Sequence, residues 1–207
     1  MRKEFYDGSS WEYEKCEKHT IFISQASYPI KGLHQLLKAT PLILRDFPDT
    51  KILIAGHDIT KVSTFVDRIK LTGYGKIIRK MIKKYHLEKH VDFLGPLNAE
   101  EMKKTYLKCN VFICPSSIEN SPNSLGEAQI LGVPCIASYV GGIPDMMKGC
   151  EENMYRFEEV EMLAEKVCIV FRNKAKQINM QCKAKNRHDK LINGKALYDI
   201  YKSIISL

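Results

Sequence analysis

The stretch from Ser116 to Pro134, SSIENSPNSLGEAQILGVP, carries two carboxylates around a run of Asn, Ser and Pro. Glu119 precedes that run, and Glu127 lies in the apolar pattern that follows it. A buried strand would not tolerate so many polar residues, and an amphipathic helix would not begin with them. A loop that leads into a helix can use every one, so we predict a loop here and a helix that begins near Asn123.

The start of this predicted helix favours an anion. The first N–H groups of a helix have no partner within it, and they lie at the positive end of the helix dipole. A phosphate can approach closely because the loop residues are small. Glu127, one turn inside the helix, can accept hydrogen bonds from sugar hydroxyls, and Glu119 lies on the far side of the same anion. The pattern favours a diphosphate between two sugar-binding carboxylates, and a capped surface helix is the alternative that spacing alone leaves open.

Short β-branched runs alternate with helical patterns, and these elements must position the two carboxylates. We predict strands, the last of them a weak edge strand, at 19–24, 51–56, 91–95, 111–115, 133–138 and 153–157. We predict helices at 31–47, 76–86, 98–109, 124–131 and 158–171, and mostly helix from there to the end. Pro41 should bend or split the first helix. Asn98 and Glu101 form a capping box, and Gly132 ends the helix that carries Glu127.

Apolar strands that alternate with helices are typical of a parallel sheet covered on both faces. We expect an α/β fold with a single Rossmann-like, doubly wound parallel sheet of about six strands in residues 19–207, and a linker rather than core in residues 1–18. In an open parallel sheet, ligands bind beyond the carboxyl ends of the strands. Residues 113–117 (ICPSS) form such an end, and the rest of the polar stretch follows directly.

The composition of the chain, with 207 residues, 44% hydrophobic and 27% charged, is that of a folded, soluble protein. No apolar run approaches the roughly 18 residues of a membrane span, and the first residues lack the hydrophobic core of a signal peptide. We therefore expect a cytoplasmic protein. The seven cysteines are odd in number and form no C-x-x-C pair, so we predict buried free thiols instead of a disulfide or zinc framework.

The net charge of +8 admits a nucleic acid, an anionic membrane surface or phosphorylated small molecules as partners. Much of the excess lies between residues 61 and 90, where apolar residues recur on one side of a predicted helix. The basic residues there include Arg68, Lys70, Lys76, Arg79, Lys80, Lys83 and Lys84, and the apolar ones are Ile77, Ile78, Met81 and Ile82. This basic face is either solvated or a peripheral membrane contact.

Residues 113–147 resemble the signature of the group-1 family of retaining glycosyltransferases with the GT-B fold. That signature has a Glu, seven residues and a second Glu, followed by A-x-x-x-G-x-P-V-I-A and a Gly-Gly turn. The matching residues are Glu119, Glu127, Ala128, Gly132, Pro134, Ile136, Ala137, Gly141 and Gly142. Upstream, KGLHQLLKA resembles the family's K-G-x-x-x-L-L-x-A, and KILIAG, VDFLGPL and LYDIYKSII resemble further elements of it.

The resemblance implies the donor-binding, C-terminal half of a hexosyltransferase-type enzyme. The substrate is a nucleoside diphosphate sugar, and no cofactor, metal or nucleic acid is implied. The acceptor, a saccharide or a lipid-linked acceptor in polysaccharide or lipopolysaccharide biosynthesis, would be bound by a separate N-terminal domain, so the isolated chain should transfer sugar poorly or not at all. A cytoplasmic position at the inner face of the membrane would suit such an acceptor.

The resemblance also implies roles for individual residues. Lys31 would neutralise the leaving diphosphate and Glu119 would contact the donor sugar, which makes these two the catalytic candidates. Glu127 would hold the ribose. The donor-binding candidates are Gln25, Gly32, Leu97, Ser121, Asn123, Ser124, Leu125 and Glu127.

The chain departs from the family pattern at two places. The family usually has Gly-Arg ahead of its Lys-Gly pair, whereas this chain has Ser24 and Gln25, so one phosphate-binding cation is missing. Pro122 has no N–H group to donate. A catalytically inactive nucleotide-binding or regulatory module is therefore the main alternative, and a basic nucleic-acid-binding domain is less favoured. A dehydrogenase would need G-x-G-x-x-G after its first strand, which FISQASYPIKG lacks.

Overall fold

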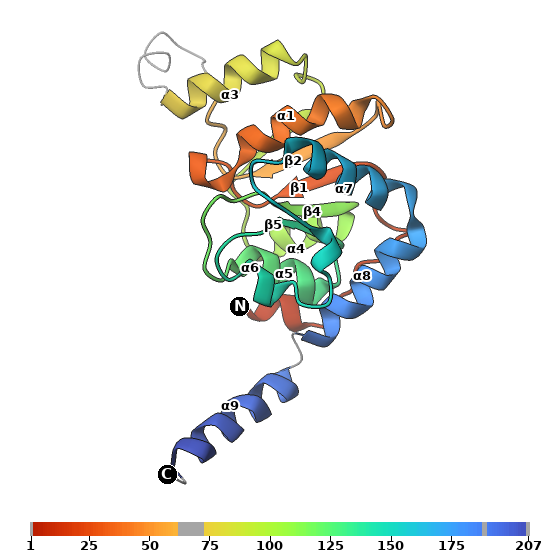
Figure 1. The fold of residues 1–207 in the computed structure, drawn as a ribbon. Coiled ribbons are helices and arrows are strands. Elements are labelled where there is room, and N and C mark those ends of the chain that lie inside the picture. The colour runs from red at the N-terminus through yellow and green to blue at the C-terminus, as the bar shows by residue number, and fades with distance from the viewer. Residues whose placement is uncertain (1, 62–72, 188–189, 206–207) are drawn as a thin grey trace.

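The computed structural model describes residues 2–61, 73–187 and 190–205, without the side chains of 182–187, 190–193 and 196. Its centre is a six-stranded parallel sheet with helices on both faces (Figure 1), which confirms the predicted Rossmann-like α/β fold. The strands are β1 (Thr20–Ile23), β2 (Lys51–Ala55), β3 (Val91–Gly95), β4 (Val111–Cys114), β5 (Cys135–Ser138) and β6 (Met154–Tyr155).

The strand order β3-β2-β1-β4-β5-β6 reverses direction between β1 and β4. Strands β2 and β3 are added on one side of β1, and strands β4, β5 and β6 are added on its other side. The loops after β1 and β4 therefore diverge to opposite faces of the sheet. This is the switch point at which open α/β sheets bind their ligands. Only two residues of the weak edge strand pair, as its sequence predicted.

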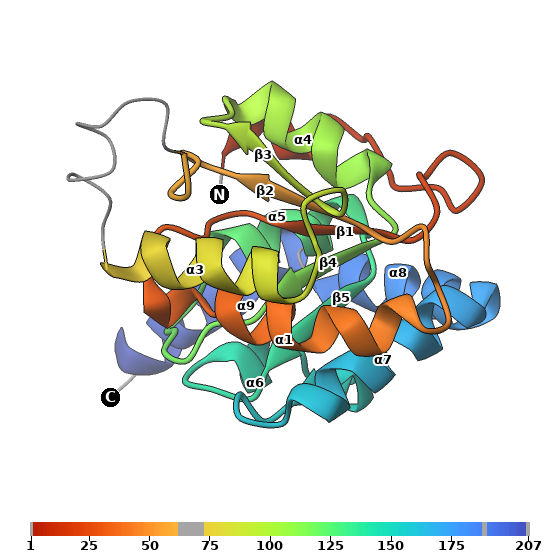
Figure 2. The ribbon, with the colours of Figure 1, turned by 90° about the horizontal axis from the view of Figure 1, so that it is seen from above.

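Helices lie on both sides of the sheet (Figure 2), and a hydrophobic core fills each of its two faces. Helices α1 (Leu33–Leu44), α3 (Gly73–Lys84) and α7 (Val160–Arg172) cover one face, and α4 (Ala99–Lys108) and α5 (Asn123–Leu131) cover the other. Helix α8 (Lys174–Arg187) contacts both α5 and α7, and its Met180 belongs to the first core. Ile21 and Ile23 of β1 enter the first core and Phe22 enters the second. Because successive side chains of a strand point to opposite faces, a sheet covered on both sides needs strands that are apolar throughout.

The remaining elements are short or terminal. They are the 3₁₀ turns η1 (Lys3–Tyr6), η2 (Pro29–Lys31) and η3 (Glu151–Asn153), and helices α6 (Ile143–Met146) and α9 (Lys190–Ile205). The described side chains of α9 are exposed. Within the described residues, no helix combines the length and the apolar character that crossing a bilayer requires.

The N-terminal segment, residues 2–18, corrects the expectation of a linker rather than core. Phe5, Trp11 and Cys16 are buried in the core that α4 and α5 share. The Trp11 indole N–H donates to the Cys109 carbonyl over 2.7 Å, and its backbone N–H donates to the Leu131 carbonyl over 2.8 Å. The segment is part of this domain because its apolar side chains close the second core. Its connection to a separate acceptor domain stays a prediction.

Three helix predictions need comment. Helix α1 begins at Leu33, two residues later than predicted, because the chain before it forms η2 and Gly32 adopts a left-handed conformation. Pro41 lies inside α1, and the helix is not split there. The capping box of Asn98 and Glu101 is confirmed.

The basic helix and the cysteines also allow a comparison with the sequence. The sequence predicted that Ile77 lies on the apolar side of α3, but its side chain is 54% exposed. The buried residues of this helix are Gly75 and Ile78. Arg68 and Lys70 lie outside the described residues. Six cysteines are buried free thiols, as predicted, and the side chain of Cys182 is not described.

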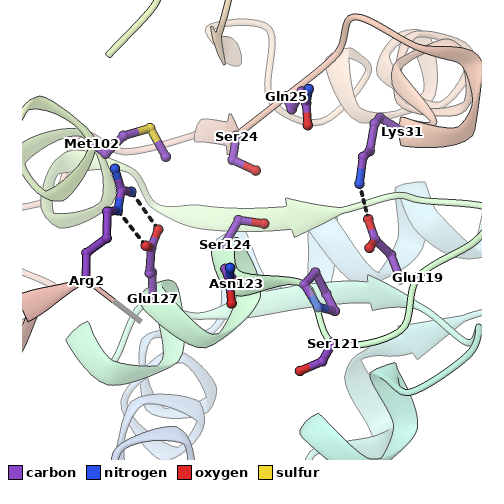
Figure 3. A pocket seen from close by; sticks show the side chains of 11 residues that line it. Arg2, Ser24, Gln25, Lys31, Met102, Glu119, Ser121, Asn123, Ser124 and Glu127 are labelled. Carbon is purple, nitrogen blue, oxygen red and sulfur yellow. Dashed lines mark hydrogen bonds and ion pairs between the residues drawn. The ribbon is translucent and has the colours of Figure 1, made fainter. Parts of the chain in front are cut away.

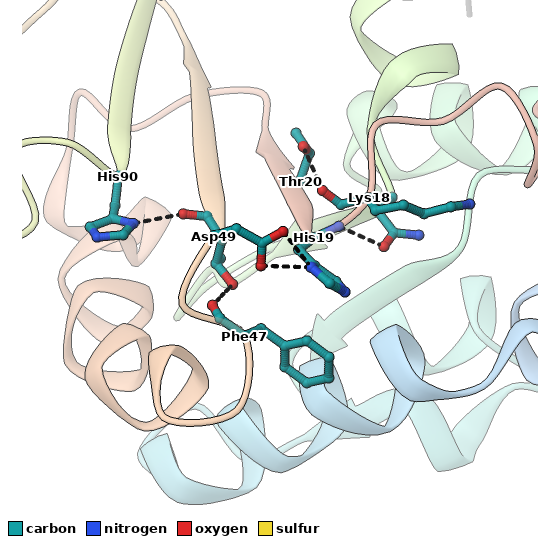
Figure 4. Close-up of polar contacts among 8 residues, drawn as sticks. Lys18, His19, Thr20, Phe47, Asp49 and His90 are labelled. Carbon is teal, nitrogen blue, oxygen red and sulfur yellow. Dashed lines mark hydrogen bonds and ion pairs between the residues drawn. The ribbon is translucent and has the colours of Figure 1, made fainter.

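Polar contacts connect the amino ends of β1, β2 and β3 to neighbouring residues (Figure 4). His19 Nδ1 lies 2.8 and 2.9 Å from the two carboxylate oxygens of Asp49, and the His19 backbone N–H donates to Asn110 Oδ1. His90 Nδ1 contacts the Thr50 carbonyl over 2.8 Å. The hydrogen bond from His19 holds the pKa of Asp49 below its ordinary value. These contacts tie the starts of β1 and β2 to their neighbours.

Candidate functional site

A pocket of about 720 Å³ opens at the carboxyl edge of the sheet, beside the switch point between β1 and β4. Four chain segments line it: the loop after β1, the loop after β4 with the start of α5, helix α4 through Met102, and the N-terminal segment (Figure 3). The lining residues are Arg2, Ser24, Gln25, Lys31, Met102, Glu119, Ser121, Pro122, Asn123, Ser124 and Glu127. Most of them are polar, so the pocket suits a hydrophilic ligand.

Glu119 stands at one end of the pocket with a cation beside it. Lys31 Nζ lies 2.5 Å from Glu119 Oε1, and the buried Ser116 hydroxyl donates to the same oxygen over 2.8 Å. The Glu119 carboxylate thus has a fixed orientation and still has lone pairs for a ligand. Lys31 comes from the turn after β1, so this ion pair joins the two loops that diverge at the switch point.

Two close backbone approaches hold these loops together. Gly141 has φ +51°, and a Cβ atom there would lie 1.6 Å from the Glu119 carbonyl oxygen. Gly32 has φ +72°, and a Cβ atom there would lie 1.6 Å from the Pro115 carbonyl oxygen. Only glycine avoids both the strain and the clash at these positions. The two glycines therefore fix the backbone on which Lys31 and Glu119 stand.

The N-terminus of α5 faces the middle of the pocket. Asn123 and Ser124 are its first two residues, so their N–H groups have no acceptor within the helix. No hydrogen bond of either N–H group is recorded with any residue that the structure describes. The buried Tyr106 hydroxyl donates to the Ser124 carbonyl over 2.9 Å, which steadies this first turn. The arrangement presents positive helix-end charge to a bound anion.

Glu127 stands at the opposite end of the pocket, and sequence reasoning did not foresee its partner. Arg2 donates from Nε to Glu127 Oε1 and from Nη2 to Oε2, each over 2.8 Å (Figure 3). Glu127 itself is 4% exposed. The hydrogen bond to this carboxylate raises the pKa of Arg2 above its ordinary value. Nothing in the mixed charges around Arg2 marked it as a site residue.

The structure brings most of the predicted site residues together. Seven of them line the pocket: Gln25, Lys31, Glu119, Ser121, Asn123, Ser124 and Glu127. Three do not line it. The Leu125 side chain is buried in the second core, Leu97 packs against that core, and Gly32 shapes the turn that carries Lys31. Their predicted contacts with a donor, and the roles of the other seven, stay predictions.

The pocket thus combines two carboxylates, two cations and a helix N-terminus. A carboxylate can accept hydrogen bonds from a pair of hydroxyl groups, and a lysine beside a helix N-terminus can hold a phosphate group. With both carboxylates paired to cations, the four ionised groups of the pocket sum to zero charge before the helix end is added. Such a pocket can bind an anion flanked by sugars.

Comparison with known proteins places this geometry in a family. The family described as "Glycosyl transferases group 1" matches residues 9–187. A phosphatidylinositol N-acetylglucosaminyltransferase gpi3 subunit from Schizosaccharomyces pombe is 24% identical over 143 residues, 69% of this chain and 28% of that protein. A GDP-mannose-dependent mannosyltransferase from Corynebacterium glutamicum is 27% identical over 144 residues, 66% of this chain and 34% of that protein. The chain thus spans about a third or less of these curated relatives.

Solved structures share the fold. Anabaena Alr3699/HepE in complex with UDP has a TM-score of 0.71 at 20% identity, over 90% of this chain and 49% of that chain. The C-terminal domain of a group 1 glycosyl transferase, LpcC from Francisella tularensis, has a TM-score of 0.66 at 18% identity, over 85% of this chain and 87% of that domain. The chain therefore belongs to the group 1 family of glycosyl transferases and has the fold of the C-terminal domain of a GT-B glycosyltransferase.

Proposed function

We propose that the pocket binds a nucleoside diphosphate sugar, and that the chain is the donor-binding domain of a retaining glycosyltransferase. The observation that carries the proposal is the α5 N-terminus between the carboxylates of Glu119 and Glu127, where the N–H groups of Asn123 and Ser124 have no partner among the described residues. A nucleoside diphosphate sugar has its groups in the same order: the ribose hydroxyls, the anionic diphosphate and the hydroxyls of the transferred sugar.

Each end of the pocket suits one part of that donor. Glu127, one turn into α5, would accept hydrogen bonds from the ribose hydroxyls, and Glu119 would accept them from the transferred sugar. Lys31 lies beside Glu119, close to where the bond between sugar and diphosphate would lie. Together with the α5 N-terminus, it would stabilise the negative charge that grows on the diphosphate as that bond breaks.

The reaction exchanges one bond at the anomeric carbon of the sugar. The bond from this carbon to the β-phosphate oxygen breaks, a bond to an acceptor hydroxyl oxygen forms, and the acceptor's proton leaves with the nucleoside diphosphate or to solvent. Retention places the new bond on the same face as the old one. The chain's own contribution is to bind the donor and to stabilise the leaving group.

We further propose that the acceptor is a saccharide or a lipid-linked saccharide, bound by a domain outside this chain, in the cytoplasm at a membrane surface. Two relatives are named for phosphatidylinositol-based acceptors: the gpi3 subunit, and the Corynebacterium enzyme, whose full name specifies a monoacylated phosphatidylinositol monomannoside. The solved structures similar to this chain include a protein in complex with UDP and with UDP-glucose. The chain spans about a third of its curated relatives. We therefore expect it to bind the donor without a further domain, but to transfer sugar poorly or not at all.

Calorimetric titration of the 207-residue chain with UDP, GDP and ADP tests the proposal. We expect one of them to bind saturably. Glu127→Ala and Lys31→Ala should each weaken that binding by about tenfold to a hundredfold, since each removes a charge-assisted hydrogen bond of about 1.5–3 kcal/mol.

Two exposed residues outside the pocket provide matched controls. Glu88→Ala and Lys104→Ala remove the same charges and should leave the affinity within about twofold. Thermal unfolding of every variant separates lost binding from lost folding. The proposal fails if the unsubstituted chain binds none of the three nucleotides, or if the controls weaken binding as much as the pocket variants do.

A further inference from the structure

Arg2 is held in the pocket by a segment that packs firmly on the domain. Phe5 is buried and meets the Tyr106 ring edge-on, with ring centroids 6.0 Å apart. Lys103, itself buried, donates to the Glu4 carbonyl over 3.3 Å and to Asp7 Oδ2 over 2.9 Å. With Trp11 anchored on Cys109 and Leu131, the segment has contacts on both α4 and α5. The position of Arg2 is thus set by packing and not by its ion pair alone.

The charges of the pocket make Arg2 important for an anionic ligand. Of the described residues that line the pocket, only Lys31 and Arg2 are cationic, and Gln25 contributes no charge. Without Arg2, the two carboxylates would outnumber the single lysine, and Glu127 would be buried without a counter-ion. A diphosphate would then meet a pocket with net negative charge, which repels it.

The geometry leaves Arg2 free to do more than pair with Glu127. A guanidinium has five N–H donors, and the recorded hydrogen bonds use one on Nε and one on Nη2. Among the residues that the structure describes, Nη1 has no hydrogen-bond partner, and the Arg2 side chain lines the pocket and is 41% exposed. Each oxygen of Glu127 also keeps a lone pair for a hydroxyl. The pair can therefore stay intact while a ligand binds beside it.

We infer that Arg2 is a further donor-binding residue: it supplies the second positive charge that the diphosphate needs and orients Glu127 toward the ribose. The inference rests on the proposed function of the pocket and extends it to a residue outside the family match, which begins at residue 9. It assigns the N-terminal segment a role in binding in addition to its role in the core.

Three substitutions of Arg2 separate its charge from its hydrogen bonds. Arg2→Ala removes both, Arg2→Gln keeps a hydrogen-bond donor without charge, and Arg2→Lys keeps the charge without the planar fork. In titrations with the nucleoside diphosphate that the unsubstituted chain prefers, we expect Arg2→Ala and Arg2→Gln to weaken binding at least tenfold. Arg2→Lys should weaken it by less than about fivefold.

Lys3 is the matched control, because it neighbours Arg2, is exposed and does not line the pocket. Lys3→Ala should change the affinity by less than twofold. The affinity of the unsubstituted chain should fall more steeply with salt than that of Arg2→Ala, since one phosphate contact of opposite charge is lost in the variant.

The outcomes distinguish this inference from the proposed function. If Glu127→Ala and Lys31→Ala weaken binding but Arg2→Ala does not, the proposed function stands and the inference is wrong. Tighter binding by Arg2→Ala would show that Arg2 competes with the ligand for Glu127, which also overturns the inference. If the Arg2→Gln variant binds the nucleoside diphosphate as tightly as the unsubstituted chain does, the positive charge of Arg2 has no role in binding. If the unsubstituted chain binds no nucleotide, both proposals fail.

Discussion

Both edges of the sheet pair a carboxylate with a basic side chain, but the carboxylates at the carboxyl edge are largely buried and the one at the amino edge is exposed. At the carboxyl edge, the side chains of Glu127 and Glu119 are 5% and 11% exposed, and each has a cation from a distant segment. At the amino edge, the side chain of Asp49 is 65% exposed beside His19. These contacts appear in Figures 3 and 4.

This difference distinguishes charges that suit ligand binding from contacts that only connect neighbouring strand ends. Burying a carboxylate costs desolvation free energy that its ion pair rarely exceeds, so a fold gains little stability from such a pair. An exposed pair contributes about 0–1 kcal/mol and costs little to form. At the amino edge, exposed polar contacts with a small desolvation cost therefore connect the starts of the strands. The carboxyl edge holds buried, oriented charges, which fits a surface built to receive a polar ligand.

The largest effect should come from breaking the backbone of the carboxyl edge. Gly141→Ala combines a left-handed backbone with a Cβ atom 1.6 Å from the Glu119 carbonyl oxygen. We expect it to reduce the free energy of unfolding by about 3 kcal/mol or more, which lowers the melting temperature by roughly 6–12 °C. Nucleotide binding should fall with it, because Glu119 moves.

Gly8→Ala is the control for backbone strain. Gly8 has φ +88°, but a Cβ atom there meets nothing within 4 Å. We expect a loss of only about 1–2 kcal/mol from the left-handed conformation. If the two variants unfold at the same temperature, the close approach at Gly141 does not constrain the carboxyl edge.

A medium effect should come from adding charge at the carboxyl edge. Gln25→Arg places a third cation on the pocket wall, and we expect nucleoside diphosphate to bind about threefold to tenfold more tightly, or about 1 kcal/mol. Titration measures the change. Ile77→Arg adds the same charge on the exposed face of α3 and should leave the affinity unchanged. Unchanged or weaker binding by Gln25→Arg would mean that no anion approaches this wall.

The smallest effect should come from the amino edge. Asp49→Asn removes the His19 pair, and we expect a melting temperature lower by about 0–4 °C at neutral pH. Because the pKa of Asp49 is lowered in the folded protein, its stabilising contribution is present above the ordinary value of 3.8 and is lost as the pH falls below it.

Melting curves of both proteins across pH 3–7 check this prediction. The difference between them should shrink below about pH 4. Asp92→Asn, at an exposed position of β3, controls for the loss of one charge. A difference that stays constant over the whole range would contradict the role of the Asp49 carboxylate.

Local sequence patterns were enough to predict the elements of the fold. The six apolar runs, the capping box of Asn98 and the glycine after Leu131 each depend on neighbours within a few residues, so their signals survive without tertiary information. The polar stretch after β4 was likewise predicted as a loop and a helix start. Parallel strands put that loop at the carboxyl edge, where the pocket lies.

Tertiary packing alone decided the partners of the two carboxylates and the place of the N-terminal segment. Arg2 and Glu127 are separated by 125 positions in the chain, and no periodicity or turn signal connects residues so far apart. Residues 1–18 were predicted to be a linker because Gly8, Ser9 and Ser10 lie there among mixed charges. Phe5 and Trp11 are core residues because they pack against α4 and α5. The sequence determined which residues could do chemistry, and packing decided which of them meet, because contact between distant segments depends on how whole elements pack.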